Sequence, residues 1–184
     1  MAEYYFIAQL PSLDCIDENA PLPITEERFL ELAERFLGKK AWREVTGLTL
    51  APAVSGEKSS SALVEAWNQG ERKLRLALAV ARASKRKKTF DVGDMILPLE
   101  LIKIAKEAVE MSDPLEAEKY LGAYRLGFLE ALRPADPFSE DFVFYYGLKL
   151  KLISRLKQFD AEVGSSAYRN IYSSIIGGDS LEVK

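Results

Sequence analysis

The sequence has no histidine and only one cysteine, and each shortage excludes a class of chemistry. Without histidine the chain has no Ser-His-Asp or Cys-His catalytic group, and most catalytic zinc sites are excluded as well. The single cysteine, Cys15, has no disulfide partner within the chain, which is typical of a reducing compartment. This composition favours a binding or assembly role over catalysis.

Long apolar runs are also missing. No stretch reaches the roughly 18 apolar residues that a transmembrane helix needs. Near the start, Glu3 stands where a secretory signal requires positive charge, and Pro11 interrupts the apolar run. We therefore expect a cytoplasmic protein that does not insert directly into a membrane.

What the chain does contain is the composition of a folded domain. Its 184 residues are 48% hydrophobic and 29% charged, with a net charge of -3, and this length suits one ordinary domain. Apolar residues recur at helical spacing, and helix start signals stand at Thr25, at Asp113-Pro114 and at Ser139. The pattern predicts an all-α fold, a bundle of about six to eight helices with short connections.

The expected organisation is one helical domain over residues 1–178, followed by a flexible tail at 179–184. A division into 1–92 and 93–178 is the alternative. In the helix expected over residues 59–84, Asn68-Gln69-Gly70 indicates a break. A weaker helix is expected between residues 160 and 177, whereas residues 4–7 fit either a strand or a first helical turn.

One short segment approaches a nucleotide-binding motif without reaching it. In Gly56-Glu57-Lys58-Ser59, Glu57 separates Gly56 from the lysine, whereas a P-loop has its second glycine directly before the lysine. Ala51 stands five positions before Gly56, where the first glycine should be. A carboxylate inside the phosphate cradle would repel phosphate. We interpret the segment as a loop that leads into a helix cap, and we expect no cofactor.

The mild net charge conceals an uneven distribution. Residues 1–34 hold eight acids and one base, whereas residues 71–88 hold one acid, Glu71, and eight bases. The basic stretch is typical either of a solvated helix end, where cations complement the helix dipole, or of a surface that docks an acidic partner. No aromatic residues are interleaved with it, so nucleic acid is not an expected partner.

The segment from Phe138 to Phe159 has apolar residues over about 200° of a helical wheel, wider than a surface helix needs. It is therefore predicted to pack between other helices. Lys149 falls inside the apolar arc, so it must either snorkel to solvent or find a carboxylate, and a charged contact to a partner protein is the sharper alternative. Lys151 and Arg155 fall outside the arc. The candidate partner-binding residues are Arg82, Lys85, Arg86, Lys87, Lys88, Lys149, Lys151 and Arg155.

Carboxylates are plentiful, but no pair has a spacing that marks a general acid and base. No catalytic residue and no metal ligand is assigned from the sequence. An enzyme that uses carboxylates or Mg²⁺ remains the third and least favoured hypothesis, because carboxylates from distant segments can converge.

Two segments resemble a known family. The opening Tyr4-Tyr5-Phe6-Ile7-Ala8-Gln9-Leu10-Pro11-Ser12-Leu13 resembles that of a small uncharacterised bacterial family whose members are encoded among V-type ATPase subunits. Residues 145–156, YYGLKLKLISRL, and the following FDAEVG at 159–164 are similar to the C-terminal signature of that family. More distantly, they resemble the central-stalk cap family of V-type ATPases.

The resemblance implies an all-helical protein without catalytic activity that is associated with a rotary ion-translocating ATPase. The stalk cap holds about three related helical units, and 184 residues accommodate only part of such an array. The first hypothesis is therefore an accessory subunit, assembly factor or partial stalk cap with V-type ATPase subunits as partners, peripheral to the membrane through that complex. The second is a free-standing cytoplasmic adaptor that binds another acidic partner.

Overall fold

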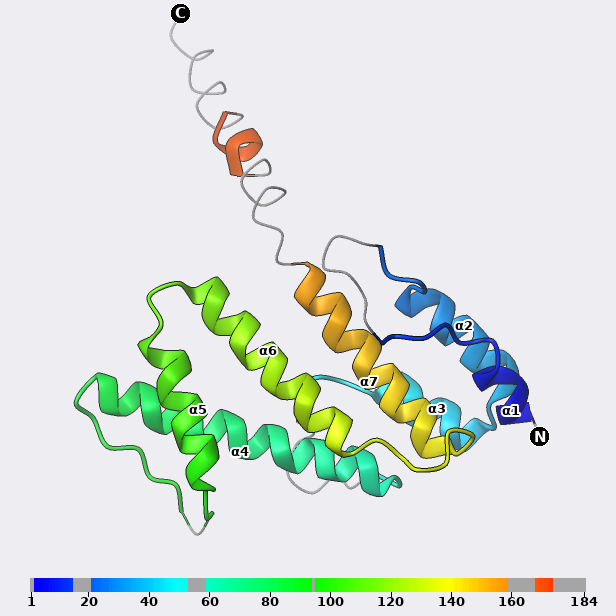
Figure 1. Ribbon diagram of the computed structural model, residues 1–184, viewed down its shortest axis with the longest axis horizontal. Helices are drawn as coiled ribbons and strands as arrows, with labels where there is room; N and C mark the ends of the chain where they lie inside the picture. Colours follow the sequence, from blue (N-terminus) through cyan, green and yellow to red (C-terminus); the bar gives the residue numbers. More distant parts are fainter. Residues whose placement is uncertain (1, 15–20, 53–58, 94, 159–167, 174–184) are drawn as a thin grey trace, which may run out of the picture.

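Helices account for the regular structure of the described residues, which in this computed structural model are 2–14, 21–52, 59–93, 95–158 and 168–173 (Figure 1). The helices are α1 (Ala2–Ile7), α2 (Glu26–Phe36), α3 (Lys39–Gly47), α4 (Ala62–Lys85), α5 (Leu99–Glu110), α6 (Pro114–Ala131) and α7 (Glu140–Lys157). A further helical segment covers residues 168–173. The prediction of an all-α, multi-helix bundle is confirmed, and residues 4–7 prove to be helical.

The helix starts expected from the sequence are formed by side-chain caps. The Thr25 hydroxyl accepts a hydrogen bond from the Arg28 amide at 3.2 Å, and Ser139 accepts one from the Phe142 amide at the same distance. Asp113 accepts a bond from the Leu115 amide at 2.8 Å, with Pro114 as the first helical residue. These bonds satisfy amides that would otherwise lack a partner at a helix start.

The predicted break at residues 68–70 is wrong, because α4 runs without interruption from Ala62 to Lys85. Gly70 instead allows a side chain of another helix to pack closely against α4. A Cβ atom at Gly70 would overlap the ring of Phe128 on α6. The glycine therefore allows two helices to approach each other, and packing offsets its poor helix propensity.

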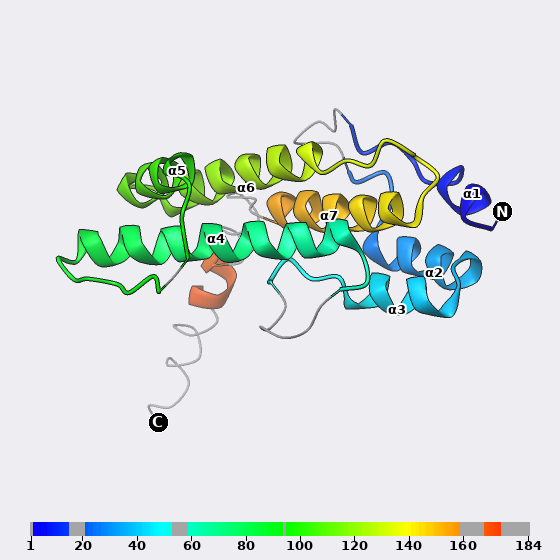
Figure 2. The same ribbon diagram turned by 90° about the horizontal axis from the view of Figure 1, so that it is seen from below.

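The long helix α4 runs along most of the molecule and contacts α5 and α7 (Figures 1 and 2). Next to it, α6 packs against both α5 and α7. The three N-terminal helices lie at one end, where α2 and α3 contact α7, and α5 lies at the other end (Figure 2). The two ends of α4 consequently lie in different surroundings.

Two separate clusters of buried apolar side chains follow from this arrangement. The larger one, here called the α7 core, is formed by α1, α2, α3, α7, the start of α4 and the end of α6, and it includes Trp67 and Leu148 at 0% exposure. The smaller one, here called the α5 lobe, is formed by α5, the second half of α4 and the first half of α6. Helices α4 and α6 contribute to both clusters and so connect them.

The middle of helix α7 is covered on all sides, in agreement with the prediction from its wide apolar arc that it packs between other helices. Every residue from Val143 to Leu150 is buried, and α7 contacts α2, α3, α4 and α6. Several other predictions fall outside the described residues: Cys15, the 56–58 part of the loop motif, the 159–164 signature and the tail at 179–184. Of the helix expected between 160 and 177, only residues 168–173 are described, and they are helical.

Candidate functional site

The eight candidate residues lie on two elements of the structure. Five of them, Arg82, Lys85, Arg86, Lys87 and Lys88, lie at the end of α4, and all five are exposed. The other three lie on α7, where Lys149 is buried, Lys151 is half-buried and Arg155 is exposed.

The end of α4 is formed by a tight turn of basic residues. The Lys87 amide bonds to the Ser84 carbonyl at 2.9 Å and the Lys88 amide bonds to the Ala83 carbonyl at 2.9 Å, which is the Schellman pattern. Lys87 has φ 54° in this turn, a left-handed conformation that glycine usually supplies. The turn therefore places consecutive cations at the negative end of the helix dipole.

Lys85 has a structural contact of its own. Its Nζ atom donates a hydrogen bond to the Val109 carbonyl at 2.5 Å, close to the C-terminal end of α5. The last carbonyls of a helix have no partner within the helix, so this lysine satisfies one of them and links α4 to α5.

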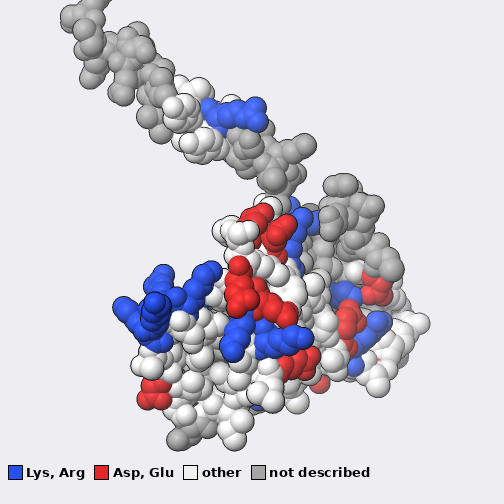
Figure 3. Space-filling view, turned by 60° about the vertical axis from the view of Figure 1, so that its left-hand side comes forward, with Lys and Arg blue, Asp and Glu red and all other residues white. Residues whose placement is uncertain are grey.

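A groove of about 630 Å³ lies where the end of α4 meets the end of α5 and the start of α6. Its apolar lining consists of Leu78, Ala108, Val109, Pro114, Ala117 and Leu121. Arg82, Lys85 and Arg86 line it as well, together with one acid, Glu118. Figure 3 shows Lys and Arg side chains gathered at one end of the molecule, beside a patch of mixed acidic and basic side chains.

Lys149 does not belong to the surface. Its side chain is 9% exposed, and its Nζ atom lies 2.5 Å from Asp14 Oδ1 and 2.5 Å from Glu130 Oε1. The alternative that Lys149 finds a carboxylate is confirmed, whereas snorkelling and a partner contact are corrected, because the ammonium group is fully engaged inside the chain. A buried cation requires such paired carboxylates.

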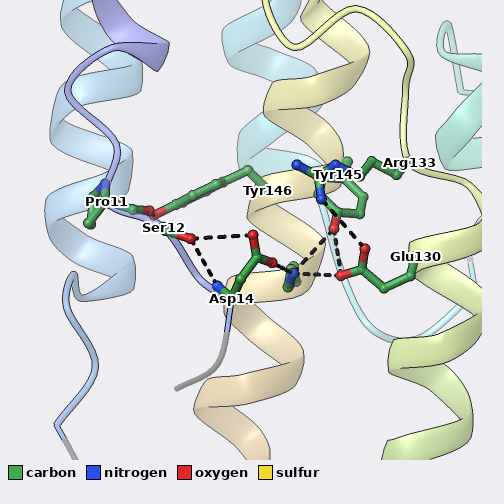
Figure 4. Close-up of polar contacts among 8 residues, drawn as sticks. Pro11, Ser12, Asp14, Glu130, Arg133, Tyr145 and Tyr146 are labelled. Carbon is green, nitrogen blue, oxygen red and sulfur yellow. Dashed lines mark hydrogen bonds and ion pairs between the residues drawn. The ribbon is translucent and has the colours of Figure 1, made fainter. Parts of the chain in front are cut away.

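Three segments supply the cluster around Lys149 (Figure 4). Tyr145 lies one turn before Lys149 on α7 and donates a hydrogen bond to Glu130 of α6 at 2.7 Å. The neighbouring Tyr146 hydroxyl donates to the Pro11 carbonyl at 2.8 Å. The cluster therefore fastens the N-terminal segment and the end of α6 to α7.

The pKa values of these groups are shifted in the directions of an ion pair. The hydrogen bond from Lys149 lowers the pKa of Asp14. Burial acts to raise the pKa of Glu130, but hydrogen bonds from Lys149 and Tyr145 outweigh it and lower this pKa. Burial likewise acts to lower the pKa of Lys149, but its hydrogen bonds to the two carboxylates and to Tyr145 raise it overall. Burial raises the pKa of Tyr145 to about 12.

Lys151 and Arg155 have partners within the chain. Lys151 Nζ lies 2.9 Å from Glu26 Oε2, and an Arg155 guanidinium nitrogen lies 2.9 Å from Glu118 Oε1. Glu118 also lies 3.6 Å from Arg125, which in turn pairs with the buried Glu71 at 2.7 Å. This chain of charges joins α7 to α6 and α4.

Sequence reasoning missed the partners in both polar clusters. Asp14 is 135 residues from Lys149, and no spacing signal connects them. Glu71 was visible as the one acid among eight bases in residues 71–88, and Arg75 one turn later pairs with it at 3.3 Å. The apolar lining of the groove was also missed, because it combines side chains from three helices.

No group of three or more Asp, Glu or Cys residues in the described part of the chain is placed to hold a metal ion. None of the described helices is long and apolar enough to cross a bilayer.

The fold and the site define an all-helical protein that has a buried ion-pair cluster and a basic, partly apolar groove. The chain belongs to the family described as "Protein of unknown function (DUF2764)", whose model matches residues 78–178. All residues that line the groove lie within the matched range. No curated protein and no solved structure matches the chain.

Proposed function

We propose that the protein is a non-catalytic helical accessory or assembly protein of a V-type rotary ATPase, and that it acts through protein–protein contacts. The observation that carries the proposal is the groove at the end of α4. Its cations Arg82 and Arg86 are exposed and form no ion pair within the described residues, and they adjoin an apolar surface. Apolar surface bordered by charge is typical of protein-binding sites.

The ATPase as partner is supported by the sequence resemblance of residues 4–13 and 145–156. These segments occupy α1, the segment after it, and α7, which lie in the α7 core and not at the groove. In this proposal the resembling segments build the helical scaffold, and the α5 lobe presents the contact surface.

A free-standing adaptor is the second candidate, and the same groove supports it. The two candidates differ only in the identity of the partner. Both require a charged surface that is not needed to hold the fold together, and the exposed side chains of Arg82 and Arg86 meet that requirement.

The test is co-purification with an affinity-tagged chain from its source cells. We expect V-type ATPase subunits to be recovered with the wild-type protein and to be lost with Arg82→Glu/Arg86→Glu. The matched control is Lys39→Glu/Lys40→Glu, which makes the same change in net charge at exposed positions of α3. Recovery of no ATPase subunit with the wild-type chain would overturn the ATPase assignment.

A further inference from the structure

The occupant of the groove can be inferred from its walls. The groove is bounded by α4, α5 and α6. Within the described residues there is no strand, so no free sheet edge is offered to an extended peptide. Two of the lining residues are alanines, Ala108 and Ala117, and small side chains let another helix approach closely. The geometry therefore fits a helix rather than an extended segment.

The charges of the groove set the chemistry of that helix. Lys85 is held by the Val109 carbonyl, and Glu118 is held by Arg125 and Arg155. Arg82 and Arg86 remain as the lining charges without an ion-pair partner among the described residues. A complementary occupant carries carboxylates.

The spacing of the two arginines adds a geometric requirement. Arg82 lies in the last turn of α4 and Arg86, four residues later, is its C-cap, so the two lie one above the other, separated by about one helical turn. Two carboxylates at positions i and i+4 of a docked helix have the same spacing. Leucine-like residues on the adjacent face of that helix would contact the apolar lining around Val109 and Leu121.

We infer that the groove binds an acidic amphipathic helix of a partner protein, with carboxylates at i and i+4 paired to Arg82 and Arg86. The inference rests on the proposed function only in requiring a protein partner. Nucleic acid is the less favoured polyanion, because the groove lining includes no aromatic side chain on which bases would stack. The apolar lining of the groove also has nothing to pack against on a phosphate backbone.

The direct test uses purified full-length chain and a synthetic probe. The probe is a stapled, fluorescent helical peptide of about five turns, with a leucine stripe and glutamates at i and i+4. A second peptide places the same glutamates at i and i+2, on different faces, and a third carries lysines in place of glutamates. Binding is followed by fluorescence anisotropy.

We expect the i,i+4 glutamate peptide to bind, and Arg82→Glu/Arg86→Glu to weaken it by about tenfold or more. Lys39→Glu/Lys40→Glu should leave it unchanged. The lysine peptide should bind the charge-reversed variant better than the wild type, which a merely unfolded variant would not do. Ala117→Phe, which fills the groove without a change in charge, should also abolish binding.

Three results would overturn the inference. The first is no binding of the acidic peptide at millimolar concentration, and the second is equal binding of the i,i+2 peptide. The third is binding of a DNA duplex that needs Arg82 and Arg86 while the peptide does not bind, which would make the groove a polyanion site. If the peptide fails while ATPase subunits still co-purify, the inference is wrong and the proposed function stands. If the peptide binds and no ATPase subunit is recovered, the inference stands and the ATPase assignment is wrong.

Discussion

The α7 core and the α5 lobe differ in whether their cations are buried and paired within the chain or exposed to solvent. In the α7 core, Lys149 is buried and paired with Asp14 and Glu130. In the α5 lobe, the cations Arg82 and Arg86 are exposed at the groove. The first arrangement holds distant segments together, whereas the second leaves charge available to another molecule.

The two regions also differ in what they bury. The α7 core contains large side chains such as Trp67, Phe6 and Leu148, all at 0% exposure. Half of the buried residues of the α5 lobe are alanines: Ala77, Ala81, Ala105 and Ala108. Small side chains contribute less apolar burial, so the α5 lobe is expected to be the less stable region. In the proposal made above, the α7 core mainly holds the fold and the α5 lobe binds the partner.

The largest expected effect comes from replacing one buried leucine by alanine in each region, which compares how much each region stabilises the fold. Leu148→Ala in the α7 core should lower the free energy of unfolding by about 3–5 kcal/mol, because it leaves a cavity in a fully enclosed site. Leu101→Ala in the α5 lobe, at 6% exposure, should cost about 2–3 kcal/mol. Urea unfolding followed by circular dichroism measures both, and an equal or reversed order would break the comparison.

The next largest effect is expected at the buried lysine. Lys149→Met leaves Asp14 and Glu130 beside each other without their cation, and should destabilise the fold by about 2 kcal/mol. The matched control, Lys151→Met on the same helix, breaks a partly exposed pair with Glu26 and should cost less than about 1 kcal/mol. Equal losses in the two variants would show that the buried cluster does not fasten the fold.

The pH dependence of stability gives a second test of the buried Lys149 cluster. The pKa values of Asp14 and Glu130 are lowered from their usual 3.8 and 4.5, so their stabilising contribution is complete above these values and is lost as pH falls through the lower, folded-state values. The pKa of Lys149 is raised from 10.5, so its contribution persists up to at least that pH. The stability gap between wild type and Lys149→Met should therefore narrow below about pH 4. A gap that is constant from pH 7 to pH 3 in urea titrations would contradict this.

The smallest expected effect is a gain in stability in the α5 lobe. Lys87 has a left-handed conformation at φ 54°, and glycine there avoids the steric cost of a Cβ atom. Lys87→Gly should therefore stabilise the protein by about 0.5–1 kcal/mol. The control is Lys88→Gly at the next residue, where φ is not positive. This variant should not raise the melting temperature measured by thermal unfolding. A loss of stability on Lys87→Gly would show that its side chain supports the fold.

Local signals made much of the helical framework predictable. Caps at Thr25, Asp113 and Ser139 are read from neighbouring residues, and so is the wide apolar arc of α7. The prediction of a break at residues 68–70 was wrong because the glycine at position 70 makes room for the Phe128 ring of another helix and does not end its own helix. Tertiary packing here overrides a local signal.

The candidate site was predictable only in part, for a similar reason. A run of bases at the end of α4 can be seen in the sequence, and so can a lysine inside an apolar arc. Whether a given cation is free depends on partners that the fold brings from elsewhere, such as Asp14 for Lys149 and the Val109 carbonyl for Lys85. Sequence spacing therefore identified the charges but could not separate the internal ones from those at the surface.

The most direct test of the central claim measures partner recovery and stability on the same variants. For Arg82→Glu/Arg86→Glu, the account predicts that recovery of V-type ATPase subunits falls by about tenfold or more. The free energy of unfolding should stay within about 1 kcal/mol of wild type. Lys149→Met should show the reverse pattern, with reduced stability and retained recovery of the subunits. Full recovery with the charge-reversed groove, or a loss that follows stability in both variants, would contradict the division between a region that holds the fold and one that binds.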